Sequence, residues 1–265
     1  MFKYKISNLH LNSPSILKNA GFCAAAQELQ LQGWALVGAN VVRKVFAFDN
    51  ARVGMQSEFT ASWDNLPRDP HLADGGCYRF RRHASLLQTF SLTAPCLTAS
   101  LTQVPYRPHW QPLTYNKLHG GRFRHFAPIT DEVAASPIYM RLLSGLGQLF
   151  CALKPTRQWY VEAHQFRIDA SQGTGLPTPE GAHRDGVDFV ALLLIRRGTL
   201  SGGTTSIHTL EGETLIKTTL SEPLTLMLLD DNRVAHATTP VEAEGTTPVR
   251  DTLVLTYRSS GFLEP

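Results

Sequence analysis

The chain has 265 residues, of which 43% are hydrophobic and 18% charged. These values are typical of a soluble globular protein that is large enough to bury a full core. The net charge of +3 is too small to predict a polyanionic partner, and no Lys/Arg run forms a nucleic-acid patch. No stretch approaches the roughly 20 apolar residues of a membrane-spanning helix. We therefore expect neither a nucleic acid nor a membrane as partner.

The cysteines and the N-terminal sequence predict the cellular compartment. Cys23, Cys77, Cys96 and Cys151 are scattered without the short spacing of a structural zinc site. The first ten residues lack the apolar core of a signal peptide. We expect a cytoplasmic protein with reduced cysteines.

The first half of the chain combines helical patterns with loops. Ser13 to Leu31 has apolar residues at helical spacing, with Ser13 or Ser15 as a possible cap and Gly33 after its end. The stretch 34–37 follows as a buried strand, and 136–153 is a second predicted helix. Without a convincing linker we expect one domain over 1–265. Its helical, loop-rich part, to about 155, would pack on a metal-binding core of about 157–260.

Two arginine pairs in this half lie in patterned stretches. Arg79 and Arg81 alternate with aromatic residues at the period of a half-buried strand, which favours a solvated strand face. Because guanidinium groups bind carboxylates bidentately, the same two residues could instead line an anion pocket. Further on, Gly120 and Gly121 precede Arg122 and Arg124, which suggests a hairpin or tight loop near a binding site.

The second half reads as a series of short strands. Alternating or apolar stretches occupy 159–168, 189–195, 204–208, 224–229 and 252–257, and glycines mark the turns between them. Many short strands with glycine-rich turns indicate a β-sandwich or jelly roll. With the helices of the first half, the expected fold class is mainly β with flanking helices (α+β).

A His-x-Asp pair stands between a Pro/Gly-rich loop and the apolar run at 189–195. His183 and Asp185 are two residues apart, so on an extended backbone both side chains point to the same side. His236 offers a third ligand after a later buried strand. Two histidines and one carboxylate on one face of a metal leave the opposite face open, as in non-haem Fe(II) oxygenases. Arg250 lies at the start of the next strand, where it could bind a carboxylate.

These residues belong to a set of blocks that resembles a known family, the Fe(II)/2-oxoglutarate-dependent dioxygenases that hydroxylate free amino acids, L-isoleucine dioxygenases among them. The resemblance covers most of the chain from about residue 30 onward. The blocks are 62–67 with 78–82, 115–116 with 120–122, 162–167, 177–186, and 229–231 through His236 to 239–240.

The resemblance implies a double-stranded β-helix of the cupin-like jelly-roll type. It also implies Fe(II) held by His183, Asp185 and His236, with 2-oxoglutarate and O2 as co-substrates and Arg250 paired with the distal carboxylate of 2-oxoglutarate. The family's reaction releases succinate and CO2 and hydroxylates an unactivated C–H bond. The expected partner is thus a small-molecule substrate, most simply a free L-amino acid.

Residue type and block position suggest which side chains bind that substrate. Its carboxylate could be held by Arg79, Arg81, Arg122 or Arg167, and its ammonium by Glu162 or an Asp. His164 could line the pocket or stabilise the sheet, and the same alternative holds for Arg167. The sequence leaves the oligomeric state open, a homodimer included.

Other interpretations compete with the oxygenase. A cupin-type isomerase or a zinc hydrolase could use the same sandwich, and so could a sensor that binds a small molecule without catalysis. His183 and Asp185 could be a hydrogen-bonded loop pair, and Arg250 could pair with Asp251 or Asp231. Asp230 and Asp231 are expected to be turn or supporting residues rather than ligands.

Overall fold

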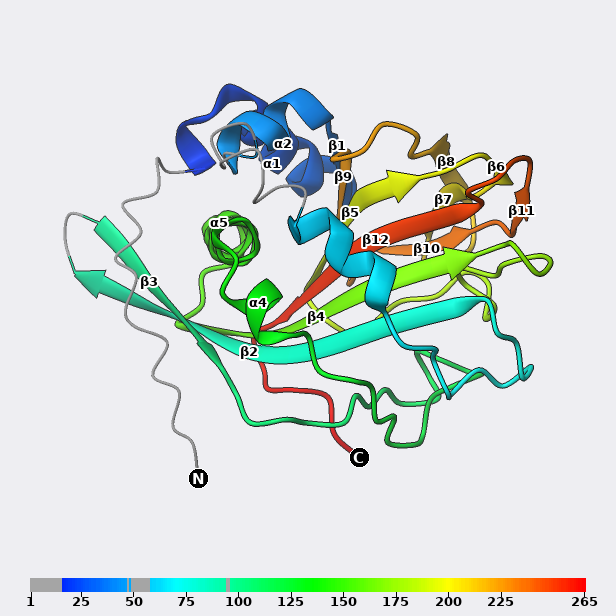
Figure 1. Cartoon of the computed structure of the whole chain (residues 1–265). Helices are drawn as coiled ribbons and strands as arrows, with labels where there is room; N and C mark the ends of the chain where they lie inside the picture. The colour runs from blue at the N-terminus through cyan, green and yellow to red at the C-terminus, as the bar shows by residue number, and fades with distance from the viewer. Residues whose placement is uncertain (1–15, 47, 49–57, 94–95) are drawn as a thin grey trace.

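Two layers of antiparallel strands, with helices against the outer face of the larger one, form the protein (Figure 1). The computed structural model describes residues 16–46, 48, 58–93 and 96–265. The helical elements are η1 (Ile16–Lys18), α1 (Ala20–Gln32), α2 (Ala39–Val45), η2 (Ser62–Asn65), α4 (Asp131–Ala134) and α5 (Pro137–Leu153). The strands are β1 (Trp34–Val37), β2 (Arg79–Thr93), β3 (Cys96–Gln103), β4 (Gln158–Asp169), β5 (Phe189–Arg197), β6 (Leu200–Gly202), β7 (Thr204–Thr209), β8 (Thr214–Thr219), β9 (Leu226–Asp230), β10 (Val234–Thr238), β11 (Val241–Ala243) and β12 (Val249–Arg258).

The larger sheet joins strands from both halves of the sequence. Its seven strands run in the order β1-β9-β5-β12-β4-β2-β3. The smaller layer consists of the sheet β10-β7-β8 and the pair β11-β6. This architecture confirms the predicted mainly β, jelly-roll fold, and it places β1, β2 and β3 of the first half in the same sheet as the strands of the second.

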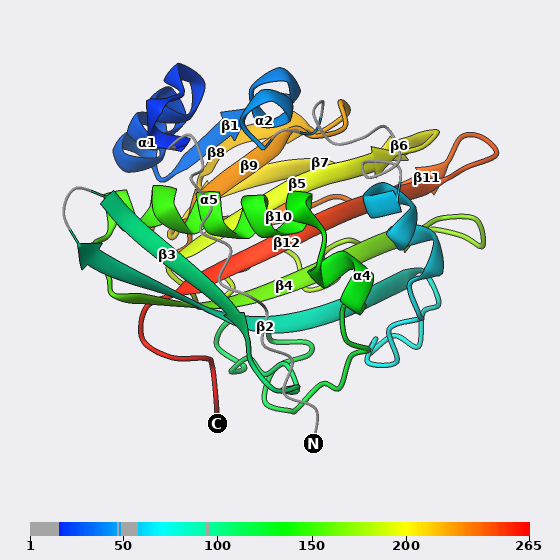
Figure 2. The ribbon, with the colours of Figure 1, turned by 60° about the vertical axis from the view of Figure 1, so that its left-hand side comes forward.

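The larger sheet is buried on both faces, which explains the unbroken apolar run of β5. On that strand Phe189, Ala191 and Leu193 belong to a core shared with α1, α2 and α5. Val190 and Leu192, which alternate with them, pack in a second core against the smaller layer. Figure 2 shows α5 lying across the outer face of the sheet. The inner face, between the two layers, also lines a pocket.

The two predicted helices are present, but the start of the first is not where the sequence suggested. The Asn19 side chain accepts hydrogen bonds from the backbone N–H groups of Gly21 and Phe22, so Asn19 caps α1. The expectation that Ser13 or Ser15 caps this helix is therefore wrong, and both residues lie outside the described part of the chain. Gly33 ends α1 in the left-handed conformation (φ 84°), as predicted.

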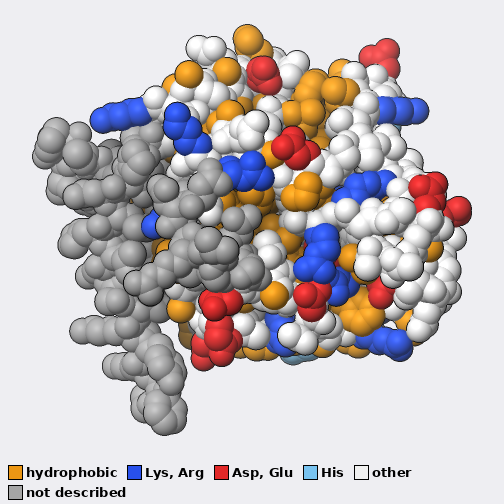
Figure 3. Space-filling view, turned by 45° about the horizontal axis from the view of Figure 1, so that its top comes forward, with side chains coloured by type: hydrophobic (Ala, Val, Ile, Leu, Met, Phe, Trp, Pro, Cys, Tyr) orange, Lys and Arg blue, Asp and Glu red, His pale blue; other side chains and the backbone are white. Residues whose placement is uncertain are grey.

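On the face drawn in Figure 3, basic and acidic side chains are interspersed with apolar ones. Among the residues that the structure describes, no helix combines the length and the apolar character needed to cross a membrane.

Candidate active site

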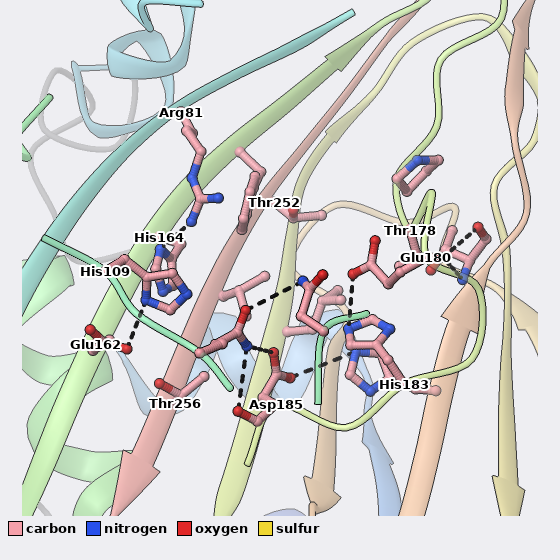
Figure 4. Close-up of a pocket in the computed structure, with 18 of the residues that line it drawn as sticks. Arg81, His109, Glu162, His164, Thr178, Glu180, His183, Asp185, Thr252 and Thr256 are labelled. Atoms are coloured by element: carbon pink, nitrogen blue, oxygen red, sulfur yellow. Dashed lines mark hydrogen bonds and ion pairs between the residues drawn. The ribbon is translucent and has the colours of Figure 1, made fainter. Parts of the chain in front are cut away.

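His183, Asp185 and His236 come together at one end of a pocket on the inner face of the larger sheet (Figure 4). One ligand atom from each lies within 4.8 Å of the others. His183 and His236 exchange two backbone hydrogen bonds of 3.0 and 2.9 Å, which place the imidazole centroids 4.5 Å apart. This isolated bridge joins the 177–186 loop to β10 and accounts for the pairing of two residues far apart in sequence.

The His-x-Asp pair lies in an irregular segment before β5, although the sequence suggested a strand. Asp231 supplies the hydrogen-bond acceptors that a neighbouring strand would otherwise provide for the backbone of this segment. Its carboxylate accepts hydrogen bonds from the backbone N–H groups of Asp185, Gly186 and Val187, at 2.8 to 3.0 Å. Gly186 has φ 80°, a conformation that favours glycine. Asp231 is thus a supporting residue, as predicted, and it fixes the turn that presents Asp185.

Hydrogen bonds and burial control the protonation of the two imidazoles. His183 Nδ1 is 3.0 Å from the carbonyl of Gly181, which leaves Nε2 free to face the pocket. Burial alone would lower the pKa of His183, but the carboxylates of Glu180 and Asp185 raise it above its usual value. Burial and the neighbouring His183 hold the pKa of His236 well below its usual range. His236 is therefore neutral, the form in which imidazole binds a metal.

Arg250 is a buried cation without a partner. It lies on β12 with 3% of its surface exposed and lines the same pocket. Neither its Nε nor its Nη2 has a hydrogen-bond partner among the described residues. Asp251 points to the opposite face of the sheet and is paired with Arg167. The alternative pairing of Arg250 with Asp251 or Asp231 is therefore not observed. Burial and the nearby Arg197 lower the pKa of Arg250 to about 10, so it remains charged at neutral pH.

The wall of the pocket that the larger sheet forms is built from side chains that lie in register across three strands. Ile168 on β4 pairs with Arg79 on β2 and with Arg250 on β12. Two residues further along each strand, Phe166 pairs with Arg81 and Thr252 in the same way. Because side chains two apart share a face, each of these rows points into the pocket.

Arg79 and Arg81 are 5% and 4% exposed, so the favoured interpretation of a solvated strand face is wrong. Asp69 accepts a hydrogen bond of 2.7 Å from Arg79 Nε and lies 3.8 Å from Arg81 Nη1. Burial alone would raise the pKa of Asp69, but the two arginines lower it below its usual value. The alternation of aromatic and basic residues was read correctly as a strand, but the polar face is the one turned inward.

Glu162 stands at the far end of this wall, within a group of buried histidines. Its two oxygens lie 3.2 Å from His83 Nε2 and 3.0 Å from His109 Nδ1. His164 Nδ1 accepts a hydrogen bond of 2.7 Å from Arg81, which can only donate. Burial lowers the pKa of His109 to about 4, and burial together with Arg81 keeps the pKa of His164 well below its usual range. The potential ligand atoms of His83, His109, Glu162 and His164 lie within 4.8 Å of one another. Glu162 is already hydrogen-bonded to His83 and His109, however, and His164 to Arg81.

Two predicted substrate residues lie outside the pocket. Arg122 is exposed and donates to the carbonyl of His71. Arg167 forms a two-fold hydrogen bond with Asp251 and another with Asp64, on the helix side of the sheet. Arg167 and His164 are three residues apart on β4. Because successive side chains of a strand point to opposite faces, the sequence already excluded that both point into the pocket.

Several pocket residues were missed from the sequence, among them Arg124, Gln111 and Glu180. Arg124, two residues after Arg122, is 2% exposed and donates to Gln111 at 2.7 Å. Gln111 in turn lies 3.4 Å from Asp185 Oδ1. Glu180 belongs to the same loop as His183 and lines the pocket beside it. The only signal for Arg124 was its Arg-x-Arg pattern after the glycine pair, and that pattern does not say which arginine is buried.

The fold and the site define the class of the protein, a jelly roll with a candidate His–Asp–His metal centre between its layers. A family model described as "2OG-Fe dioxygenase" matches residues 60–256. The chain therefore belongs to the 2OG-Fe dioxygenase family, whose members use Fe(II), 2-oxoglutarate and O2. This membership makes the protein a dioxygenase and leaves the isomerase, hydrolase and sensor alternatives without support.

Solved structures agree with this assignment. A bsmA homolog from Methylobium petroleophilum PM1 is 42% identical over 92% of this chain and 96% of its own, with a TM-score of 0.82. IDO from Bacillus thuringiensis (18% identity, 91% and 96% covered, TM-score 0.72) shares the fold. So does the Fe(II)/(alpha)ketoglutarate-dependent dioxygenase TqaL (18%, 92% and 89%, TM-score 0.71). No curated protein matches the chain.

The residues of the pocket fit the family's cofactor and co-substrate. Two imidazoles and one carboxylate within 4.8 Å of one another are a donor set for Fe(II). The buried, unpartnered donors of Arg250 fit a carboxylate, the group that 2-oxoglutarate carries at each end. The fit extends to the supporting residues, since the Asp231 hydrogen bonds fix Asp185 and the carbonyl of Gly181 fixes His183.

Proposed function

We propose that the protein hydroxylates an unactivated C–H bond of a free L-amino acid or a similar small polar substrate, at the expense of 2-oxoglutarate. The observation that carries this proposal is the composition of the pocket. A candidate metal triad and a free Arg250 share it with a second set of buried arginines on β2 and the 106–126 loop. The metal triad and Arg250 suit Fe(II) and the co-substrate. The second set of arginines remains for a substrate that bears a carboxylate.

In this proposal His183, Asp185 and His236 hold Fe(II), and Arg250 binds the distal carboxylate of 2-oxoglutarate. Fe(II) with 2-oxoglutarate and O2 supplies the oxidising power, and succinate and CO2 are released. The chain's own contribution is orientation and exclusion of water. Asp231 holds the turn of Asp185, and the apolar side chains of Val187, Leu192 and Val254 line the pocket between the polar groups.

The second set of arginines would take the carboxylate of the substrate. Arg79 Nη2, Arg81 Nε and Arg124 Nε are buried and lack hydrogen-bond partners among the described residues. Among the described residues, Asp69 is the only carboxylate that forms an ion pair with any of these three arginines. A ligand carboxylate would satisfy these donors, and guanidinium geometry favours a two-fold hydrogen bond with it.

The proposal is tested by measuring succinate release from 2-oxoglutarate, with Fe(II), ascorbate and O2, across the twenty L-amino acids. We expect one or a few of them to stimulate turnover, and the variant His236→Ala to be silent. Slow, substrate-independent consumption of 2-oxoglutarate would retain the oxygenase and refute the amino-acid substrate. No turnover in protein with one iron per chain would contradict the site as assigned.

A further inference from the structure

We propose that Glu180 is the residue that binds the ammonium group of the substrate, so that the pocket is a receptor for a zwitterion. This inference rests on the proposed function and adds a specificity-determining residue to it. Glu162, the acidic residue that the sequence suggested for this role, is instead part of the supporting wall of the pocket.

The Glu180 carboxylate is buried and only partly satisfied. Its side chain is 9% exposed, and Oε2 has no hydrogen-bond partner among the described residues. Its other oxygen lies 3.6 Å from His183 Nε2, beyond a hydrogen bond of good geometry. A buried carboxylate oxygen without a donor is costly, and an ammonium group supplies both the missing hydrogen bond and the opposite charge.

Glu180 faces buried arginines with which it forms no hydrogen bond or ion pair among the described residues. Figure 4 places Glu180 beside His183, across the pocket from Arg81 and His164. Arg124 lines the same pocket, yet no described hydrogen bond or ion pair joins it to Glu180. One side of the pocket thus offers a free acceptor, and the other offers free guanidinium donors. An α-amino acid carries the complementary pair of charged groups, an ammonium and a carboxylate, on the same carbon atom.

The backbone around Glu180 is held in place, as a binding residue requires. Gly181 N–H donates to the carbonyl of Thr178 in a tight turn, and Gly181 has φ 79°. Thr178 Oγ1 donates to the carbonyl of Thr238 and accepts from its N–H, at 3.0 and 2.9 Å. Because Thr238 is on β10, two residues after His236, the turn that carries Glu180 is attached to the strand that carries the candidate metal ligand.

Two other roles fit the geometry less well. Each oxygen of Glu162 is already within hydrogen-bond distance of a histidine, so an ammonium group would compete with an existing network. Glu180 Oε1 lies 3.6 Å from the candidate ligand His183, but Glu180 is not among the three residues whose ligand atoms all lie within 4.8 Å of one another. Its free oxygen is therefore available to a substrate.

The test compares amino acids with the same molecules lacking the amine. The probe pairs are L-leucine with 4-methylpentanoate, L-isoleucine with 3-methylpentanoate, and L-methionine with 4-(methylthio)butanoate. Binding is measured by calorimetry on the full chain with Fe(II) and 2-oxoglutarate in the absence of O2, so no turnover is needed. The proteins are wild type, Glu180→Gln, Glu180→Asp and, as a matched control, Glu242→Gln on the exposed surface of β11. Iron content and thermal unfolding are recorded for each.

We expect the wild-type protein to prefer the amino acid of at least one pair by roughly tenfold or more, the value of one charge-assisted hydrogen bond. Glu180→Gln should bind both members of that pair about equally, with unchanged iron content. Glu180→Asp, whose carboxylate is one methylene shorter, should keep part of the preference, and it replaces Glu180→Gln if the latter does not fold. Glu242→Gln should match the wild type.

Three results would overturn the inference. The first is a Glu180→Gln variant that retains the preference for the amino acid. The second is a wild-type protein that does not distinguish the two members of any pair. The third is a loss of iron in Glu180→Gln, which would assign Glu180 to the metal centre. Failure of the proposed function looks different. In that case no amino acid in the panel stimulates succinate release, whereas an error about Glu180 alone leaves amino-acid-dependent turnover intact.

Discussion

At the His183 end of the pocket several buried polar atoms lack partners among the described residues, whereas at the other end the carboxylate of Glu162 and the histidines around it are hydrogen-bonded. Arg250 Nε and Nη2, His236 Nδ1 and Glu180 Oε2 have no hydrogen-bond partner among the described residues. Glu162, by contrast, accepts from two histidines, and His164 accepts from Arg81. Both ends line the same pocket, between the larger sheet on one side and the 177–186 loop with β10 on the other.

This difference separates groups that bind ligands from groups that shape the pocket. An unpartnered buried charge is costly in the free protein, and a ligand that pairs with it removes that cost. A saturated network stabilises the fold and gains little from a further partner. Substitutions at the unpartnered end should therefore change the binding of small molecules, and those at the saturated end should change stability.

The largest effect is expected for Arg250→Leu. Removal of the guanidinium should raise the KM for 2-oxoglutarate by roughly 100-fold, since a charge-assisted pair contributes about 1.5 to 3 kcal/mol. The apparent affinity for Fe(II) should change little. Steady-state kinetics with 2-oxoglutarate varied, together with iron analysis, checks this. A KM within threefold of wild type would show that Arg250 does not bind the co-substrate.

The next effect concerns Asp231→Asn. The new amide can accept fewer of the three N–H groups that Asp231 now binds, so the turn of Asp185 should loosen. We expect the affinity for Fe(II) to fall roughly 10- to 100-fold, as is usual for residues that position metal ligands. Titration with Fe(II) under anaerobic conditions measures it. Asp230→Asn, one residue earlier in the same turn, is the control and should bind iron like the wild type.

At the saturated end, Glu162→Gln should act on stability. A glutamine has one acceptor oxygen for two histidine donors, so one buried donor loses its partner. We expect the free energy of unfolding to fall by about 1 to 3 kcal/mol, which urea denaturation can measure against Glu242→Gln. If stability were unchanged and the KM for the amino acid rose instead, Glu162 would belong with the ligand-binding groups.

A smaller effect should distinguish two neighbouring arginines. Arg124→Gln removes a buried pocket donor and should raise the KM for the amino-acid substrate by roughly tenfold. Arg122→Gln removes an exposed side chain that donates to the carbonyl of His71 and does not line the pocket, so this KM should stay unchanged. Equal effects of the two substitutions would mean that the loop acts as a unit and that Arg124 holds no substrate carboxylate.

The smallest effect is a pH dependence of stability. His109 has a pKa of about 4 in the folded protein because of burial, compared with about 6.5 in an unfolded chain. Between these values the unfolded state binds a proton that the folded state does not, so stability falls as the pH falls from about 6.5 towards 4. One such group contributes a slope of about 1 kcal/mol per pH unit. His109→Gln should reduce the slope by that amount in urea denaturation at pH 5 to 6.5, and an unchanged slope would refute the assignment.

The sequence by itself indicated several of the strands, the two long helices and the residues of the candidate metal centre, but strands such as β3, β8 and β10 were not predicted. Alternation in 159–168 and the apolar run at 189–195 are local properties, and local patterns predict strands well. The His-x-Asp pair and His236 were recognisable because their spacing and surroundings are distinctive. Strand alternation also contained the information that Arg167 and His164 face opposite sides of β4.

Only the tertiary structure decided which arginines enter the pocket. The inward direction of Arg79 and Arg81 depends on the pairing of β2 with β4, which sets Arg81 opposite Phe166 and within hydrogen-bond distance of His164, 83 positions later in the chain. The choice of Arg124 over Arg122 depends on how an irregular loop packs, and Glu180 was not distinguishable from other loop carboxylates. A sequence pattern shows that two faces differ, but burial is a property of the assembled sheets, because the partner strand and the covering layer determine which face loses its water.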